Sequence, residues 1–496
     1  MRPQVRHREG PLSQSIDHIE RSVAAVTDVA DRGQVAGAVT SVSAEMIVDV
    51  LHGGGDAGQG ELVASGIGAS PGVAGGVVRT TVDGALDAFD RGEEVVLAMA
   101  GTSPADEIAM RIAVAVVTES GGLASHAAVV ARDLGVAAVV GTGPTPLRDG
   151  DEVWVDGATG EVRRPGQASA AAAPILDELP DSLAQLLGWA DDLATVRVLA
   201  NADRTDSAAL ARRFGARGIG LCRIEHMFLG DRAEIVAAAL GDDPVANEEI
   251  AKVLTDDLVG VFGEMSGLPV TVRLLDAPLH EFGGPHEHNP MMGLRGVRLG
   301  VVNEPLLRAQ ARAIGAAARA AATAGHAPAA RIMVPLVSLP AELELVAGWV
   351  RDEVGPDIPV GVMVETPRAA LCADRLAATA EFISFGTNDL TQFTYGWSRD
   401  DLEQRILDPY RRSGLLDVSP FETLDEGGVA RLMALATETA RAARPGIPIS
   451  MCGEHGGDPR SVAVAARMGV DAVSASPYRV PVARLAAGHA AIAGAR

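Results

Sequence analysis

Charged side chains of the kinds that handle phosphate follow short apolar runs in the second half of the sequence. Two carboxylates, Glu365 and Asp389, come just after such runs and together could hold one hard cation, for which we expect Mg²⁺. Arg223, Arg273 and Arg295 could each grip a phosphate or carboxylate through paired hydrogen bonds. A metal ion beside arginines is the usual apparatus of phosphoryl transfer. Each residue alone is better explained by a surface ion pair, but their shared position favours the chemical interpretation.

A thiol occupies a comparable position. Cys452 closes another apolar run, and Gly453 after it would let the thiol point inward beside a substrate. A buried, unreactive cysteine and a proton donor both fit this placement. His455, three residues further on, could relay a proton or could equally serve packing.

A second centre lies in the first half of the sequence, where Gly121 and Gly122 precede a helix-like run that begins near His126. The glycines allow a tight turn, and the histidine then falls in the first turn of the helix. A phosphate carried on that imidazole would meet unpaired N–H groups and the positive end of the helix. An ordinary helix-capping histidine is the alternative, and it is as good an explanation of His126 taken alone.

The residues after the apolar runs need a fold that brings strand ends together. We count eight β-like runs separated by helix-like stretches: Val196–Ala200, Gly218–Cys222, Val270–Leu275, Ile332–Leu336, Val360–Val364, Phe382–Phe385, Ile447–Met451 and Ala472–Ala475. This alternation predicts a closed (β/α)8 barrel of the TIM type over residues 191–496, with its chemistry at the carboxyl ends of the strands. An open doubly wound sheet is the alternative, but no glycine-rich dinucleotide turn follows the first run.

The N-terminal residues have a different character. Residues 61–165 alternate short Val-rich runs with turns, and we expect a small mixed domain of strands with one helix over residues 125–134. Residues 166–190 read as a linker, whose small, polar beginning at residues 166–174 runs into a helix. Residues 1–60 carry two apolar stripes at helical spacing, and we expect Gly33 and Gly37 to interrupt the helix between them.

Composition limits the class of protein. The chain has 496 residues, 47% of them apolar and only 3% aromatic, and a net charge of −23. That charge argues against nucleic acid or an anionic membrane as a main partner. The three cysteines lie far apart in no metal-binding spacing, and no signal peptide or membrane span is readable, so we expect a cytoplasmic protein.

Several long segments resemble, in order, the motifs of the phosphoenolpyruvate-utilising enzymes. The segment TESGGLASHAAVVARDLG is similar to the family's phosphohistidine signature, and further segments are similar to its barrel motifs: GIGLCRIEHMF, VRLLDAPLHEF, NPMMGLRGVRL, VETPRAAL, SFGTNDLTQFTYGWSRDD and CGEHGGDPRSVA. Together they span roughly residues 62 to 490. The LCR-x-EHMF and LLD-x-PLHEF phrases make the chain most similar to the pyruvate, phosphate dikinases within that family.

The resemblance implies a phosphotransferase that interconverts phosphoenolpyruvate and pyruvate through a phosphohistidine. His126 would carry the phosphoryl group, and Cys452 would protonate the enolate of pyruvate. Arg223 and Arg273 would bind the substrate phosphate with support from Arg295. The remaining implied roles are Mg²⁺ ligation by Glu365 and Asp389, and a substrate site lined by Gly386, Thr387, Asn388 and Asp389. The small domain would swivel to carry the phosphoryl group between sites.

The resemblance also raises the question of the phosphoryl partner. About 60 residues precede the phosphohistidine region, too few for the nucleotide-binding domain of a dikinase, and no Walker-type loop is present. We therefore expect the ATP step to be absent or supplied by a separate nucleotide-binding chain, and we expect a homodimer formed through the barrel. One alternative is a phosphoryl donor to a carrier protein, as in enzyme I of the sugar phosphotransferase system. Another is a non-catalytic metabolite sensor, although a sensor need not keep nucleophile, proton donor and metal ligands together.

Overall fold

The computed structural model describes residues 11–52, 60–102, 106–123, 125–165, 176–228, 232–241, 243–399 and 406–495. The chain divides into two compact units, Met1–Leu193 and Ala194–Arg496. Predictions that concern residues 1–10, 53–59 and 166–175 lie outside the described residues.

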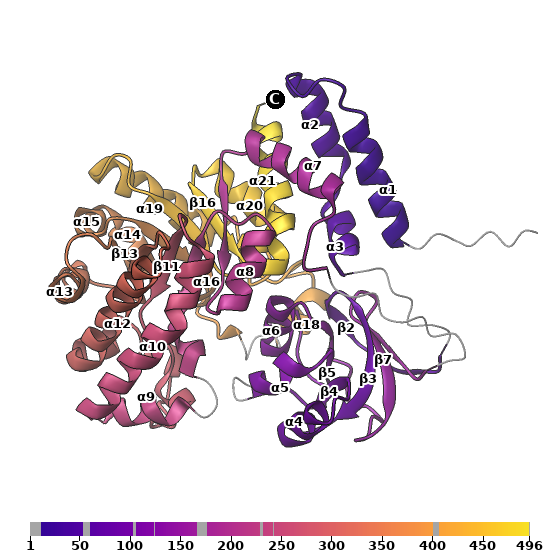
Figure 1. Ribbon diagram of the computed structural model, residues 1–496, viewed down its shortest axis with the longest axis horizontal. Coiled ribbons are helices and arrows are strands. Elements are labelled where there is room, and N and C mark those ends of the chain that lie inside the picture. The colour runs from indigo at the N-terminus through magenta and orange to yellow at the C-terminus, as the bar shows by residue number, and fades with distance from the viewer. Residues whose placement is uncertain are drawn as a thin grey trace, which may run out of the picture. The chain divides into compact units, whose positions relative to one another are not determined.

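The C-terminal unit is built around a closed barrel of eight parallel strands (Figure 1). Each strand pairs with the next in sequence, and the last pairs with the first, Ala472 lying opposite Arg197. The strands are β9 (Arg197–Asn201), β10 (Ile219–Arg223), β11 (Pro269–Arg273), β12 (Ala329–Val334), β13 (Val360–Val364), β14 (Ile383–Gly386), β15 (Ile449–Cys452) and β16 (Ala472–Ala475). Strands buried on both faces read as continuous apolar runs, which is why the sequence revealed them. The predicted barrel is confirmed, and the open sheet is wrong.

Helices surround these strands (Figure 1). Alanine supplies much of their packing: Ala309, Ala313, Ala317 and Ala321 recur every fourth residue on one helix and are all buried. Such small side chains fill a core that has few aromatic residues. The α-helices are α8 (Thr205–Arg213), α9 (Ala233–Leu240), α10 (Pro244–Glu264), α11 (Val297–Val302), α12 (Glu304–Thr323), α13 (Pro340–Val354), α14 (Pro367–Leu371), α15 (Ala373–Thr379), α16 (Thr387–Tyr395), α18 (Leu407–Arg412), α19 (Val429–Ala443), α20 (Pro459–Arg467) and α21 (Val480–Gly494). Short 3₁₀ helices are η2 (Ile224–Phe228), η4 (Leu279–Phe282), η5 (Pro290–Met292), η6 (Glu454–Gly457) and η7 (Pro477–Arg479).

The N-terminal unit contains a mixed eight-stranded sheet in the order β1-β8-β7-β3-β4-β5-β6-β2. Its strands are β1 (Leu62–Ser65), β2 (Ile67–Ser70), β3 (Val73–Arg79), β4 (Val95–Met99), β5 (Ala115–Thr118), β6 (Ala137–Val140), β7 (Glu152–Asp156) and β8 (Glu161–Arg163). Three helices accompany them: α4 (Val82–Asp90), α5 (Glu107–Ile112) and α6 (His126–Leu134).

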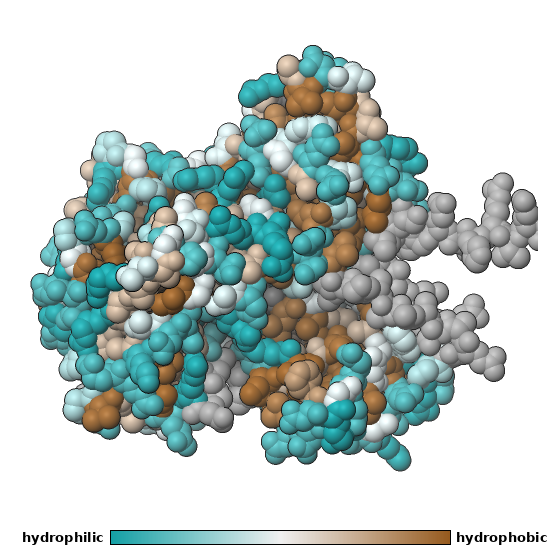
Figure 2. Space-filling view, viewed as in Figure 1, coloured by the Kyte–Doolittle hydropathy of each residue, from teal (hydrophilic) through white to brown (hydrophobic). Residues whose placement is uncertain are grey.

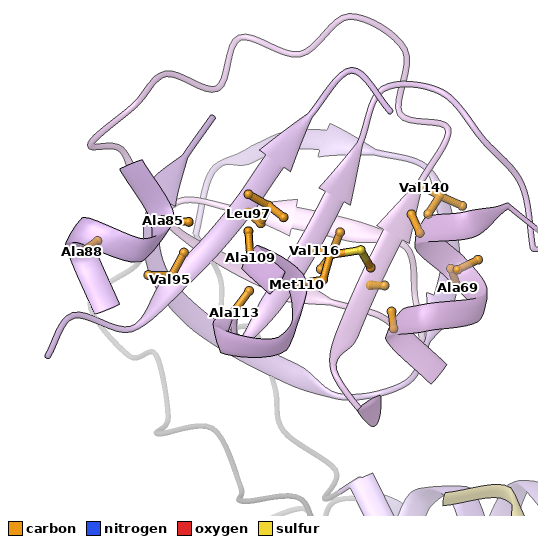
Figure 3. Close-up of a cluster of buried hydrophobic side chains, with 14 residues drawn as sticks. Ala69, Ala85, Ala88, Val95, Leu97, Ala109, Met110, Ala113, Val116 and Val140 are labelled. Atoms are coloured by element: carbon orange, nitrogen blue, oxygen red, sulfur yellow. The ribbon is translucent and has the colours of Figure 1, made fainter. Parts of the chain in front are cut away.

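Side chains of the central strands alternate between two cores. Leu97 and Val116 face the helices, where Figure 3 shows them gathered with Ala109 and Met110 of α5. Their strand neighbours, such as Val96, Ala115 and Val117, face a second core that includes residues of β7 and β8. This period-two alternation, with both faces buried, accounts for the Val-rich runs of the sequence.

The N-terminal unit also includes helices α1 (Pro11–Ala24), α2 (Arg32–Ser41), α3 (Ala44–His52) and α7 (Asp181–Leu193). One prediction is wrong here. Helix α2 runs through Gly33 and Gly37, and it begins after Asp31, whose carboxylate accepts a hydrogen bond from the Gly33 N–H at 2.8 Å. The helix that the linker was expected to run into is α7, which packs against α1 and α2.

Hydrophilic side chains cover most of the visible surface of the C-terminal unit, in keeping with the negative net charge (Figure 2). No single helix among the described residues is long and apolar enough to cross a membrane. One helix pair, α2 with α3, meets those criteria only when taken together, across a bend of 64°.

Candidate active site

Three carboxylates meet at the rim formed by the carboxyl ends of the barrel strands. Glu365 directly follows β13, Asp389 lies in the first turn of α16 after β14, and Asp276 follows β11 by three residues. One oxygen from each carboxylate lies within 4.8 Å of the others. Glu365 and Asp276 are only 1% and 4% exposed. Burial without a counter-charge is costly for a carboxylate, so such a cluster needs compensating cations.

Glu365 carries most of this electrostatic cost. Burial, together with the charges of Asp389 and Asp276, raises the pKa of Glu365 well above its ordinary value. The backbone N–H of Leu336 donates to Glu365 Oε1 at 2.5 Å. Leu336 adopts a left-handed conformation with φ of 55°, which costs a non-glycine residue roughly 1–2 kcal/mol. The barrel therefore accepts backbone strain where it fixes this carboxylate.

Arg295 compensates the other two carboxylates. Its Nε and Nη2 donate to the two oxygens of Asp276 at 2.8 and 2.9 Å, and Nη2 also reaches Asp389 at 3.4 Å. Although burial alone would raise it, the neighbouring arginine charges lower the pKa of Asp276 overall. From the sequence we expected Arg295 to support phosphate binding. In the structure its guanidinium group donates to the carboxylates of Asp276 and Asp389 instead.

Arg273 and Arg223 differ in the number of ion pairs and hydrogen bonds that their guanidinium groups form. The guanidinium of Arg273 is held between Glu225, with which Nη2 forms a short ion pair, and Asp276, whose Oδ2 lies 3.3 Å from Nη1. The half-buried guanidinium of Arg223 has no hydrogen-bond or ion-pair partner within the described ranges of the chain. Arg223 is thus the arginine most available to an incoming anion.

Sequence reasoning assigned no role to Asp276 or Glu225. A signal for Asp276 was present, because it ends the third apolar run three residues after Arg273. Glu225 gave a weaker signal: it sits two residues after Arg223, in the first turn of η2. The ion pair between Glu225 and Arg273 is a tertiary contact, and it cannot be predicted from the spacing of these residues along the chain.

The thiol of Cys452 is 1% exposed at the end of β15. Its partners are the hydroxyl of Ser384, which donates to Sγ at 3.6 Å, and the backbone oxygen of Phe385, to which the thiol donates at 3.5 Å. Burial raises the pKa of Cys452, and the Ser384 hydrogen bond offsets part of that rise.

The hydrogen bonds of His455 fit the packing role, which is one of the two that we considered for it. It is fully buried, with Nδ1 2.7 Å from the hydroxyl of Thr387 and Nε2 2.9 Å from the carbonyl oxygen of Pro420. A carbonyl only accepts, so Nε2 carries a hydrogen. The thiol of Cys452 is not among the hydrogen-bond partners of His455. The imidazole instead ties the loop at Pro420 to Thr387, whose hydroxyl lies 2.8 Å from the Cys452 carbonyl.

Glycines are required where β14 and β15 end. A side chain at Gly386 would collide with the Glu365 carboxylate. At Gly453, φ is +103° and a Cβ would lie 2.5 Å from the Thr387 hydroxyl and 3.0 Å from Asn388 Oδ1. The residues from 386 to 389 and from 452 to 453 are therefore packed closely together at the rim.

His126 lies in the other unit, at the first residue of α6. Ser125 caps this helix, with its hydroxyl accepting from the Ala128 N–H at 3.4 Å. Gly121 before it has φ of +113°, and a Cβ there would lie 2.9 Å from the Ser125 hydroxyl. The turn therefore sets the half-buried imidazole beside the amide groups of a helix N-terminus.

The donor set at the barrel rim fits a hard divalent cation. All three candidate ligands offer carboxylate oxygen, the ligand type that Mg²⁺ prefers. Arg295 holds both oxygens of Asp276 at 2.8 and 2.9 Å but those of Asp389 only at 3.4 Å, which leaves Glu365 and Asp389 as the better ligands. A cation there would also relieve the repulsion that raises the pKa of Glu365.

Glu281 in η4 gives a pH-dependent prediction. Burial and the charge of Glu225 raise the pKa of Glu281 to about 7 from an ordinary 4.5. The folded state then holds a proton that the unfolded state has released, so the free energy of unfolding should fall as pH rises from 4.5 to 7 and level off above. Glu281→Gln should remove about 2 kcal/mol of the loss between pH 5.5 and 8. Urea unfolding in EDTA at both pH values tests this, and an identical loss in the two proteins would contradict it.

Comparison with known proteins agrees with this division of the chain. Residues 178–492 match the model of the PEP-binding domain of PEP-utilising enzymes, and residues 91–160 match the model of their mobile domain. The chain is 42% identical to pyruvate, phosphate dikinase 2 of Zea mays over 86% of its length. It is 41% identical to the chloroplastic pyruvate, phosphate dikinase 1 of Arabidopsis thaliana over 87% of its length, and 40% identical to the pyruvate, phosphate dikinase of Rhizobium meliloti over 88%. These matches cover 54%, 50% and 54% of the three relatives, so the chain spans about half of their length.

Proposed function

Because the chain belongs to the family of PEP-utilising enzymes, we propose that it transfers a phosphoryl group between phosphoenolpyruvate and His126. In the forward direction phosphoenolpyruvate and the histidine give pyruvate and phosphohistidine. The observation that carries the proposal is the rim of the barrel, where three carboxylates, three arginines and a thiol lie at or after the ends of the strands. This set can hold a metal ion, bind an anion and donate a proton.

Two arginines would bind the substrate. Arg223, which has no partner among the described residues, would take the phosphoryl group, and Arg273 would donate from the N–H groups that Glu225 and Asp276 leave available. Arg295 would act indirectly, by fixing Asp276 and Asp389. Gly386, Thr387 and Asn388 would line the substrate beside them, since no bulkier residue fits at Gly386.

Glu365 and Asp389 would hold Mg²⁺, which when bound would neutralise charge between the phosphoryl group and the enolate oxygen. Glu365 and Thr387 would themselves be shielded from bulk water, since they are 1% or less exposed. Low exposure strengthens every electrostatic contact with the substrate.

His126 would receive the phosphoryl group on its imidazole. At the first residue of α6 the transferred phosphate would meet unpaired N–H groups and the positive end of the helix dipole. Since the histidine belongs to the other unit, we propose that the small domain swivels to present it to the substrate. The second phosphoryl partner of His126 would be a nucleotide-binding domain or a phosphoryl carrier, and the barrel would form a homodimer.

Cys452 would supply the proton that the enolate needs at carbon. We expect Cys452→Ala to bind phosphoenolpyruvate normally and to slow exchange of the pyruvate methyl hydrogens with deuterium by roughly 10²–10⁴-fold. The exchange is followed by proton NMR in D₂O with Mg²⁺. Cys222→Ala is the matched control, because that thiol is also buried in the barrel, on β10, and has no assigned role. Exchange at the wild-type rate in Cys452→Ala would refute Cys452 as the donor.

A further inference from the structure

The thiol of Cys452 lies in an apolar part of the barrel interior. It packs in one buried cluster with Leu221, Met333, Met363 and Phe382. None of these side chains can donate a hydrogen bond to sulfur. The Ser384 hydroxyl is therefore the side-chain donor that the structure gives to this thiol, at 3.6 Å from Sγ.

Ser384 is itself 1% exposed, and among the described residues its hydroxyl donates to Cys452 alone. It lies on β14, two residues before Gly386, which pairs in register with Cys452 on β15. Sulfur is a weak hydrogen-bond acceptor. A buried hydroxyl that donates to sulfur therefore makes a weaker hydrogen bond than it would make to oxygen. Such an arrangement is expected where the sulfur carries negative charge at some stage, because a donor to a charged acceptor is roughly twice as strong as one to a neutral acceptor.

We propose that Ser384 is a positioning residue that stabilises the thiolate of Cys452 during proton transfer. This inference rests on the proposed function. In that reaction the S–H bond of Cys452 breaks as the C3–H bond of pyruvate forms, the electron pair stays on sulfur, and the thiolate regains a proton from solvent water. In the reverse direction the same thiolate removes a methyl proton from pyruvate. In both directions the Ser384 O–H faces more charge on sulfur than in the resting thiol.

Loss of the Ser384 hydroxyl should change the rate of proton transfer and not the affinity for substrate. A donor that strengthens only as charge develops lowers the barrier without changing substrate binding. Ser384→Ala should therefore slow deuterium exchange into the pyruvate methyl group by roughly 10–100-fold, somewhat less than the loss of a donor to an oxyanion. The pyruvate concentration for half-maximal exchange should stay within about twofold of wild type, because no ground-state contact to substrate is lost.

The chain offers a matched control in Ser450. This serine pairs in register with Ser384, but its hydroxyl donates to the backbone oxygen of Ile383 at 3.4 Å and not to the thiol. Ser450→Ala removes one hydroxyl group from the neighbouring strand β15, and we expect this variant to exchange the pyruvate methyl hydrogens at the wild-type rate. Ser384→Thr returns a hydroxyl to position 384 and should recover most of the rate.

The experiment measures methyl exchange with Mg²⁺ in D₂O for wild type, Ser384→Ala, Ser384→Thr, Ser450→Ala and Cys452→Ala. Phosphorylation of His126 by phosphoenolpyruvate is measured in parallel, since it precedes protonation and reports an intact site. Slow exchange with normal phosphorylation in Ser384→Ala supports the inference. Wild-type exchange in Ser384→Ala, or equal loss of exchange and phosphorylation, overturns it. Failure of the proposed function looks different: Cys452→Ala would then exchange like wild type, or wild type would not exchange at all.

Discussion

Replacing His126 by alanine should abolish the transfer of phosphate from phosphoenolpyruvate to the chain. The imidazole is the proposed acceptor, and the alanine side chain offers no atom that can carry a phosphoryl group. Phosphate labelled with ³²P is followed onto the protein in the presence of Mg²⁺, and the labelled site is identified by mass spectrometry at alkaline pH, where phosphohistidine survives. We expect label on His126 in wild type and none in the variant.

His18→Ala is the control for this experiment. His18 lies in the same N-terminal unit, on α1, where its Nε2 contacts the Ser41 carbonyl at 2.9 Å. Its loss should leave labelling unchanged. Full labelling of His126→Ala would show that the phosphoryl group is carried elsewhere, and the proposed chemistry would then have to be abandoned.

The second large effect concerns the proposed metal ligands. Glu365→Gln and Asp389→Asn should each slow phosphorylation of His126 by roughly 10³-fold or more, since a metal ion contributes several kcal/mol of charge stabilisation. The rate is measured as a function of Mg²⁺ concentration. Glu344→Gln, an exposed carboxylate on α13, serves as the control and should behave as wild type.

A stability measurement separates this loss from misfolding. Burial and two neighbouring carboxylates raise the pKa of Glu365, so its charge opposes folding when no cation is bound. In EDTA at pH 7 we therefore expect Glu365→Gln to be at least as stable as wild type, while Mg²⁺ stabilises wild type and not the variant. An unchanged Mg²⁺ dependence in both ligand variants would contradict the assignment.

Much of the barrel could be predicted because its strands are buried on both faces. Such strands leave uninterrupted runs, and Val360–Val364 and Ala472–Ala475 coincide with β13 and β16. Each run also marks the residue that follows it, so Glu365, Gly386 and Cys452 could be placed at the rim before the fold was known. Their chemical roles stay predictions, because position at a strand end does not measure reactivity.

What could not be predicted depends on contacts between distant segments. Arg295 reaches the rim after a long excursion from β11, and nothing in its spacing shows that Asp276 occupies its fork. The Ser384 hydroxyl faces the thiol of a strand that follows more than 60 residues later. The sequence indicated a helix after residue 174 but not its packing against α1 and α2, which lie at the other end of the unit's sequence.

Local signals also failed at the N-terminus. Gly33 and Gly37 disfavour a helix by about 1 kcal/mol each relative to alanine. Helix α2 forms through both, because Asp31 caps its first turn and Val35 and Val39 are buried. Burial in the folded protein and capping by Asp31 thus outweighed the low helix propensity of the two glycines, on which our prediction of a break had rested.

One measurement tests the central claim most directly: a single turnover with the chain in excess over phosphoenolpyruvate and with Mg²⁺ present. Pyruvate is quantified together with protein-bound phosphate that is labile to acid and stable to base. The account predicts one pyruvate and one phosphohistidine, at His126, for each phosphoenolpyruvate consumed. Consumption of phosphoenolpyruvate with release of inorganic phosphate, or no consumption by the folded, Mg²⁺-loaded chain, would contradict it.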